Sequence, residues 1–302
     1  LIMDPSVGMK PPNFFIIGAP KCGTTSMVAW LSDHPKIFMS NPKDIYFFDT
    51  DHNTGQVKSL DQYLHIFSES DDEQLAVGEA SVMYLHSQVA VKNILQFNPA
   101  AKFIVMLRNP LDMAPSFHAQ QFVGGWECIE DFELAWRARN MRELRLGKVG
   151  PLCTELAFLQ YENMCKVGEQ VWRLLQTVDT TNVLFVLLDD IKVNPLFEYL
   201  RVLKFLGVPY EGKKHFQIQN PGMRVRSKMW HNILTRFQLF KRERLDFIKG
   251  GGALGALANL NVTQFERTSM RPELRQELLE VFSDDVLLLS TLIDRDLSHW
   301  LQ

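Results

Sequence analysis

The sequence predicts an α/β protein with a central, mainly parallel sheet flanked by helices. Three apolar runs have the length and continuous apolar character of strands buried on both faces: Phe14–Ile17, Lys102–Leu107 and Val183–Leu188. Helical patterns such as Thr24–Leu31 follow these runs. With 302 residues, 46% of them hydrophobic, the chain can bury a sizeable core, and we expect a single domain over residues 1–302.

The first predicted strand leads into a loop suited to bind an anion. The loop is bounded by Gly18 and Gly23, and the helix after it would present unpaired N–H groups and roughly half a positive charge. Lysine precedes the second glycine, whereas in a Walker A loop it follows, so this is a different phosphate loop. An ordinary strand-turn-helix with a surface lysine is the alternative. The residues predicted to bind phosphate are Lys21, Cys22, Gly23, Thr24, Thr25 and Ser26.

A turn with two charged side chains follows the short strand predicted at Lys36–Met39. Lys43 and Asp44 stand directly before the apolar cluster Ile45–Phe48. This cluster could form the wall of a cleft into which the two charged side chains point. A solvated turn in front of a core segment is the alternative.

The next predicted strand, Gln74–Ala80, ends at a carboxylate. Ligands of open α/β sheets bind outside the carboxyl ends of strands, so Glu79 and Ser81 should lie near the same rim as the anion loop. This position is the argument for Glu79 as a candidate catalytic residue. A capping or ion-pairing role is the alternative.

The strand Lys102–Leu107 indicates which anion chemistry to expect. In Mg-dependent P-loop enzymes an apolar strand typically ends in an aspartate that helps to hold the metal, but this one runs into Arg108. A guanidinium favours a phosphate over a metal ion. Eight residues further on, Ser116 could return its hydroxyl to the same phosphate.

The middle of the chain predicts a helical cover at about 119–150. Its main element is one amphipathic helix over Ile129–Gly147, and a further helix is expected over Leu156–Val178. The arginines of the first helix are predicted to form a solvated face: Arg137, Arg139, Arg142 and Arg145.

The strand Val183–Leu188 ends in Asp189-Asp190, which supports a rival interpretation. An apolar run followed by aspartate is typical of a Walker B element, so a Mg-dependent kinase-like or NTPase P-loop protein is one alternative. We favour a structural role, in which the pair caps the helix expected over Pro195–Leu206. Gly207 would end that helix.

The last third of the chain contains a basic cluster, a glycine-rich segment and a long helix. Arg224, Arg226 and Ser227 form a candidate second clamp on a polyanionic ligand, with a basic surface turn as the alternative. Gly250–Gly252 predicts a mobile loop at about 245–262, and a helix is expected over Pro272–Leu292.

Composition narrows the function classes. A net charge of −3 gives no global attraction to nucleic acid or anionic membrane, and no run approaches the ~20 apolar residues of a membrane span. The four cysteines form no cluster with histidine that would suggest a metal. We therefore expect free thiols, no bound metal and a reducing, cytoplasmic compartment.

Together the motifs resemble those of sulfotransferases that use 3′-phosphoadenosine-5′-phosphosulfate (PAPS). The stretch Gly18–Thr25 resembles the family's loop for the 5′-phosphosulfate, and Arg108 through Ser116 resembles its 3′-phosphate site. The end of the chain, Asp294–Trp300, is similar to that of bacterial members. Lys43–Phe48 followed by Gly78–Ser81 is most similar to the glycosaminoglycan-type and related bacterial branches.

The resemblance implies the P-loop-NTPase-like sulfotransferase fold, PAPS as co-substrate and no metal. Lys21 would contact the bridging oxygen of PAPS, which leaves when the sulfuryl group is transferred. Arg108, Ser116 and the turn at 224–227 would hold the 3′-phosphate. The family's carboxylate base corresponds to Asp44, and His118 is a second candidate because histidine titrates near neutral pH.

Two departures bear on the acceptor. Met113 stands where the family usually has arginine, and Ala80 where it has lysine. Both remove positive charge, which favours a hydroxyl on a small, lipid-like or carrier-bound molecule over a polysaccharide. A catalytically silent nucleotide-binding domain is the alternative from another class.

Overall fold

The computed structural model describes residues 9–52, 55, 57–143, 147–218, 223–225, 262–264 and 270–302. Contacts within the chain divide it into two compact units. Unit 1 comprises the described residues of Leu1–Pro110, Lys166–Gln219 and Ser283–Gln302, and unit 2 those of Leu111–Cys165 and Asn220–Phe282.

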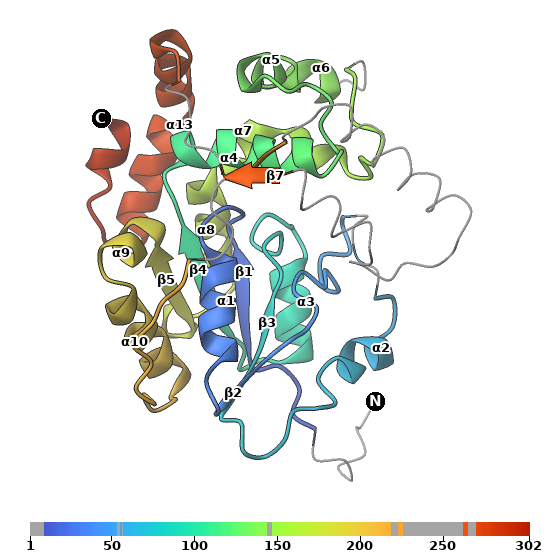
Figure 1. Cartoon of the computed structure of the whole chain (residues 1–302), viewed down its shortest axis with the longest axis vertical. Helices are drawn as coiled ribbons and strands as arrows, with labels where there is room; N and C mark the ends of the chain where they lie inside the picture. The colour runs from blue at the N-terminus through green and yellow to red at the C-terminus, as the bar shows by residue number, and fades with distance from the viewer. Residues whose placement is uncertain are drawn as a thin grey trace. The chain divides into compact units, whose positions relative to one another are not determined.

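A five-stranded parallel sheet lies at the centre of unit 1 (Figure 1). Its spatial order is β2-β3-β1-β4-β5, and each neighbouring pair is parallel. The sheet and its flanking helices confirm the fold class predicted from the sequence. The strands are β1 (Phe14–Gly18), β2 (Ile37–Met39), β3 (Ala76–Ala80), β4 (Lys102–Leu107) and β5 (Val183–Leu187).

Strand β1 is central because its residues are suited to burial on both faces. Every residue of β1 is buried. The ring of Phe15 lies 5.9 Å from that of Phe48 and 6.1 Å from that of Phe103. On the adjacent strand, a Cβ added to Gly78 would lie 2.2 Å from the Phe14 ring. The glycine in β3 is therefore required for the close packing of the first strand.

Short helices of unit 1 connect the strands, and several begin at a capping side chain. Ser59 accepts a hydrogen bond from the Gln62 amide at the start of α2, and Asn194 accepts one from the Phe197 amide at the start of α10. The elements are α1 (Thr24–Ser32), α2 (Leu60–His65), α3 (Ala90–Phe97), α8 (Val167–Leu175), η2 (Thr180–Asn182), α9 (Leu188–Val193), α10 (Pro195–Leu206) and η3 (Ser298–Leu301).

The prediction that Asp189-Asp190 caps the helix at Pro195–Leu206 is wrong. Both aspartates lie in the first turn of α9, a short helix that follows β5 directly and was not predicted. The cap of α10 is Asn194. Gly207 ends α10 in the left-handed region, with φ 74°, as predicted.

Unit 2 is mainly helical, and α13 contributes residues to both units. Its elements are α4 (Pro110–Val123, of which Pro110 belongs to unit 1), α5 (Phe132–Arg137), α6 (Arg139–Glu143), η1 (Leu156–Leu159), α7 (Tyr161–Cys165), β6 (Met223–Val225), β7 (Val262–Gln264) and the start of α13 (Pro272–Leu292). Apart from its last residue, the predicted mobile loop at 245–262 lies outside the described residues.

The two long helices predicted for the middle of the chain are broken. The Ile129–Gly147 stretch contains α5 and α6, separated at Ala138, where Arg139 donates to the Trp136 carbonyl oxygen. The Leu156–Val178 stretch contains η1, α7 and α8. Helix α8 starts anew because the Asp285 carboxylate, in α13, accepts hydrogen bonds from the Gly168 and Glu169 amides, each at 2.8 Å.

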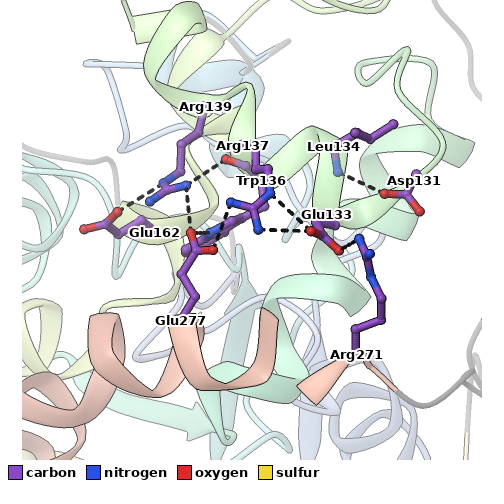
Figure 2. Close-up of polar contacts among 9 residues, drawn as sticks. All are labelled: Asp131, Glu133, Leu134, Trp136, Arg137, Arg139, Glu162, Arg271 and Glu277. Carbon is purple, nitrogen blue, oxygen red and sulfur yellow. Dashed lines mark hydrogen bonds and ion pairs between the residues drawn. The ribbon is translucent and has the colours of Figure 1, made fainter. Parts of the chain in front are cut away.

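The arginines of the α5–α6 stretch are not simply a solvated face. Figure 2 shows the side chains of Arg139, Trp136 and Glu162. The Arg139 guanidinium lies 4.0 Å from the centroid of the Trp136 indole, and its Nε lies 3.2 Å from the Glu162 carboxylate. Arg137, half exposed, pairs with Glu133 and with Glu277. The side chains of Arg142 and Arg145 lie outside the described residues.

Among the described residues, no helix combines the length and the apolar character that crossing a membrane requires.

Candidate functional site

In unit 1, the carboxyl ends of the parallel strands bring the predicted anion loop together with several other candidate site residues. Strand β1 has β3 on one side and β4 on the other, so the loop after β1 lies where the strand order reverses. In open α/β sheets this is where ligands bind. The Ser81 amide donates to the Ile16 carbonyl oxygen and the Leu85 amide to the Ile17 carbonyl oxygen. These hydrogen bonds hold the segment after β3 against the end of β1.

The anion loop after β1 turns sharply into α1. Lys21 has φ 65° and Gly23 has φ 85°, both in the left-handed region, and α1 begins at Thr24. The Ser26 and Met27 amides donate to the Gly23 carbonyl oxygen, at 3.0 and 3.2 Å. Amides ahead of them in the first turn have no acceptor within the helix, and the helix dipole makes this end electropositive. The loop therefore has the geometry of an anion site.

Two glycines of this loop are needed for steric reasons. A Cβ on Gly18 would lie 2.9 Å from the Val82 carbonyl oxygen and from the Leu85 Cβ. One on Gly23 would lie 3.0 Å from Leu188 Cδ1, in α9. The loop is thus packed closely against the segments that follow β3 and β5.

The arginine that follows β4 supports the anion loop directly. Arg108 Nη1 donates to the Lys21 carbonyl oxygen at 3.1 Å. Next to Lys21 in the loop, Cys22 is fully buried and its thiol donates to the Pro20 carbonyl oxygen. Burial raises the pKa of Cys22 to about 12, although Arg108 and Lys21 lower it. Cys22 is therefore a neutral packing group whose side chain does not face the solvent.

Asp44 lies in a turn between β2 and the apolar cluster Ile45–Phe48, and several hydrogen bonds hold this turn. It has φ 62°, and its amide donates to the Ala80 carbonyl oxygen at 2.8 Å. One carboxylate oxygen accepts from the Val82 amide at 3.2 Å, and the other pairs with Lys43 at 2.8 Å. The side chain of Asp44 is 34% exposed, which leaves it accessible at the rim of the sheet.

Glu79, at the end of β3, is fully buried. Its carboxylate accepts hydrogen bonds from the hydroxyls of Ser81 and Tyr63, each at 2.6 Å, and from Tyr84. Burial raises its pKa to about 7, against the lowering effect of these three hydrogen bonds. Glu79 therefore lies beneath the rim and has no direct access to a ligand in the solvent.

Two predicted residues lie in α4, within unit 2. Ser116 and His118 are both largely buried. His118 Nε2 is 2.8 Å from the Ile129 carbonyl oxygen, to which it donates, and its ring packs against Phe132 and Tyr161. In unit 2, His118 is thus a core histidine with one nitrogen committed to the backbone.

The predicted second clamp is described only in part. Arg224 lies in β6, which pairs antiparallel with β7 and sets Arg224 opposite Thr263. Its side chain, and all of Arg226 and Ser227, lie outside the described residues.

The aspartates after β5 hold the C-terminal segment in place. Asp189 accepts from the Trp300 indole at 2.9 Å and from Lys192 at 3.0 Å. Asp190 forms a two-pronged pair with Arg295, at 2.9 and 3.1 Å. Within the described part of the chain, no three histidine, cysteine, aspartate or glutamate side chains are grouped to hold a metal ion.

Sequence reasoning missed two tyrosines that surround Glu79. Tyr63, in α2, and Tyr84, after β3, are both fully buried with their hydroxyls on the carboxylate. Buried tyrosines normally pair their hydroxyls. A tyrosine on an otherwise apolar face was therefore the available signal.

Comparisons with known proteins identify the family. A family model described as "Sulfotransferase domain" matches residues 11–231, more than half of the chain. The chain belongs to the sulfotransferase family. This confirms the family predicted from the anion loop and from the arginine after β4.

Curated relatives of this sulfotransferase-family chain are much longer proteins. It is 28% identical over 133 residues to the membrane-associated sulfotransferase kil1 of Dictyostelium discoideum, covering 43% of this chain and 24% of the relative. It is 27% identical over 207 residues to the bifunctional heparan sulfate N-deacetylase/N-sulfotransferase 2 of Homo sapiens, covering 65% and 22%. The match therefore spans about a quarter of the length of these relatives.

Solved structures agree with this assignment. The sulfotransferase from Alicyclobacillus acidocaldarius superposes with a TM-score of 0.70 and 26% identity, covering 97% of this chain and 100% of that one. Mouse sulfotransferase SULT7A1, complexed with PAP, superposes with a TM-score of 0.52 and 12% identity, covering 96% and 90%. The second likeness supports the fold alone. The predicted sulfotransferase fold is thus confirmed.

Proposed function

We propose that this protein transfers a sulfuryl group from PAPS to an acceptor hydroxyl. The observation that carries the proposal is the anion loop Gly18–Gly23, placed where the strand order reverses and supported by Arg108. Family membership gives this loop its proposed ligand, the 5′-phosphosulfate of PAPS.

The proposed reaction requires one charge to be neutralised and one proton to be removed. The acceptor oxygen forms a bond to sulfur while the bond from sulfur to the bridging oxygen breaks, and that oxygen leaves with the electron pair. Lys21 and the amides of Gly23–Thr25 are the groups proposed to stabilise the developing negative charge. Thr24, Thr25 and Ser26 would contribute further hydrogen bonds to the 5′-phosphate.

We assign the 3′-phosphate of PAPS to Arg108 and Ser116, with Arg224, Arg226 and Ser227 as a second clamp. This phosphate distinguishes the donor from ATP. Support comes from Arg108, which follows β4 directly and already contacts the anion loop. A guanidinium in that place suits a phosphate.

Asp44 is the base we favour among the three candidates. Its carboxylate is accessible and held by the Val82 amide, so it can take a proton from a bound hydroxyl. His118 is buried and donates to a backbone carbonyl, and Glu79 is fully buried. We therefore propose that neither of these two accepts the proton.

For the acceptor we propose a hydroxyl on a small, lipid-like or carrier-bound molecule. Ala80 and Met113, which replace residues that are usually cationic in the family, are fully buried and apolar. The human relative named above is a heparan sulfate N-sulfotransferase, so a polysaccharide is the competing acceptor class. A sulfate-transfer screen with both acceptor classes separates them.

Three further parts of the proposal concern metal, compartment and domain organisation. Sulfotransfer is proposed to need no metal, because Asp189 and Asp190 are engaged by Trp300, Lys192 and Arg295. Activity that survives EDTA would support this, whereas a Mg-dependent kinase-like enzyme would lose activity.

A cytoplasmic compartment is proposed because all four cysteines are free thiols, as expected in a reducing environment. We also propose that residues 1–302 form one sulfotransferase domain, in which residues 119–150 are the helical cover predicted from the sequence.

The test of catalysis is Lys21→Ala. We expect turnover to fall by about 10²–10³, the effect of losing one donor to a transition-state charge. Lys92→Ala, an exposed lysine of α3, is the matched control and should retain wild-type turnover. Unchanged sulfotransfer in Lys21→Ala would refute the role of this residue. Binding of PAP without turnover on any acceptor would favour the catalytically silent domain instead.

The test of donor recognition is Arg108→Ala, measured by calorimetry with PAP and with 5′-AMP. A charge-assisted contact contributes about 1.5–3 kcal/mol, so affinity for PAP should fall about 10- to 150-fold while affinity for 5′-AMP stays the same. An equal loss for both nucleotides would show that Arg108 acts only by supporting the Lys21 carbonyl.

A further inference from the structure

Three consecutive amides of the loop after β2 donate to only two hydroxyl groups. The Tyr46 amide donates to Ser81 Oγ at 3.1 Å. The Phe47 and Phe48 amides donate to the Tyr84 hydroxyl, at 3.0 and 3.3 Å. These bonds fix the backbone directly after Asp44, the proposed base.

Both hydroxyls are oriented by the same carboxylate. Ser81 Oγ donates to Glu79 Oε1 at 2.6 Å, and the Tyr84 hydroxyl also donates to Glu79. A hydroxyl has a single hydrogen, so one that donates to Glu79 presents its lone pairs elsewhere. In Ser81 and Tyr84 those lone pairs accept the loop amides. Glu79 is thus connected to three amides through two intervening side chains.

The third partner of Glu79 does not bond to the loop backbone. Tyr63, in α2, donates its hydroxyl to Glu79 Oε2 at 2.6 Å, while its ring stacks on Phe47 at 4.5 Å. Burial raises the pKa of Tyr63 and of Tyr84 well above the usual value, so both remain hydrogen-bond donors. All four groups of this cluster, Glu79, Ser81, Tyr84 and Tyr63, are almost completely buried.

We propose that Glu79 is a positioning residue for sulfuryl transfer, which holds the Asp44–Phe48 loop in its reactive conformation through the hydroxyls of Ser81 and Tyr84. The inference rests on the proposed function. The same segment also fixes Asp44 itself, because the Ala80 carbonyl oxygen accepts from the Asp44 amide and the Val82 amide donates to the Asp44 carboxylate.

Protonation of Glu79 would reverse one bond of this network. A carboxylic acid must donate its own proton. A proton on Oε1 would point at Ser81, whose hydroxyl would then have to turn its hydrogen away from Glu79 and towards the Tyr46 amide that it now accepts. Burial raises the pKa of Glu79 to about 7, and the charge of Asp44 adds to the increase. The other titratable groups around the network are Tyr63 from α2, Tyr84 and Tyr46, with Asp49 acting on Tyr46 and Lys43 paired with Asp44. The ordered loop therefore belongs to the ionised form of Glu79, which predominates above pH 7.

Glu79→Gln tests this, because glutamine has the shape of the carboxylic acid but cannot ionise. Wild-type kcat should fall as the pH drops through about 7, whereas Glu79→Gln should have a kcat about tenfold lower at pH 8 and no such acid limb. The KM for PAPS should not change. A wild-type pH profile in Glu79→Gln would overturn the proposal.

Two tyrosine variants keep the test independent of that one substitution. Tyr63→Phe removes a hydrogen bond to Glu79 and keeps the stacking on Phe47, so it should move the acid limb to higher pH while kcat on the alkaline side is retained. Tyr84→Phe removes the acceptor of two loop amides and should lower kcat at every pH. Equal pH profiles for Tyr63→Phe and wild type would contradict the role of Glu79.

Hydrogen–deuterium exchange provides a readout that does not depend on turnover. Exchange of the Tyr46, Phe47 and Phe48 amides should be about tenfold faster in Glu79→Gln at pH 8, with the amides of α10 unchanged as an internal control. If no acceptor is sulfated by the wild type but exchange responds as stated, the proposed function fails and the network is supported. Unchanged exchange at these three amides would refute the network itself.

Discussion

Replacing Glu79 with glutamine should change how the stability of the protein depends on pH. Glu79 is fully buried, and its pKa lies at about 7 instead of the usual 4.5. The unfolded chain therefore releases this proton at a lower pH than the folded protein does. One pKa unit corresponds to about 1.4 kcal/mol, so the difference amounts to about 3 kcal/mol at most.

The sign of the effect follows from which state binds the proton. A carboxyl group whose pKa is raised by folding contributes stability that is complete below pH 4.5 and is lost as the pH rises to about 7. Between pH 5 and pH 8 the free energy of unfolding should thus decrease by about 2.5 kcal/mol through Glu79 alone. Glutamine does not titrate, so Glu79→Gln should lack this decrease.

Urea unfolding of both proteins at several pH values from 5 to 8 measures the effect. Subtracting the wild-type free energy of unfolding from that of Glu79→Gln cancels the titration of all other groups that the substitution leaves unchanged. The difference should change by about 2.5 kcal/mol in favour of the variant as the pH rises. Parallel curves, constant within about 0.5 kcal/mol, would refute the raised pKa and with it the pH dependence assigned to the Asp44–Phe48 loop.

Two further predictions follow from packing. Gly78→Ala should lower the free energy of unfolding by about 1–3 kcal/mol, because the added Cβ would lie 2.2 Å from the Phe14 ring. A melting temperature equal to that of the wild type would contradict the packing of β1 against β3. Iodoacetamide at pH 8 should alkylate the exposed Cys128 rapidly. Cys22 is buried and has a pKa of about 12, so it should react only after unfolding. Equal labelling of the two cysteine peptides in mass spectrometry would contradict the burial of Cys22.

The elements that could be predicted from sequence are those whose signal is local. Buried parallel strands require continuous apolar runs, so Phe14–Ile17 and Lys102–Leu107 were found within one residue of their ends. The anion loop was found because Gly18, Lys21 and Gly23 lie close together in the chain. The same holds for Gly207, whose role at the end of α10 depends only on its own backbone conformation.

The elements that could not be predicted depend on partners far away in the sequence. Helix α8 starts at Val167 because the Asp285 carboxylate accepts its first amides, and no window of neighbouring residues contains that aspartate. The Asp189-Asp190 pair looked like a cap because Trp300 and Arg295, its actual partners, lie more than a hundred residues away. The candidate site shows the same limit, since Tyr63 comes to Glu79 from α2, a separate element that only the fold brings beside β3.

The contacts of Trp300 have a consequence for how the site is assembled during synthesis. Its carbonyl oxygen accepts from the Asn109 side chain, beside Arg108, and its indole donates to Asp189, so Trp300 joins the segments that follow β4 and β5. These contacts span 191 and 111 positions of the sequence. Domains fold as units while the ribosome adds residues from the N-terminus. The anion loop is therefore made well before residue 300, yet the segments beside it are joined only after residue 300 has left the ribosome.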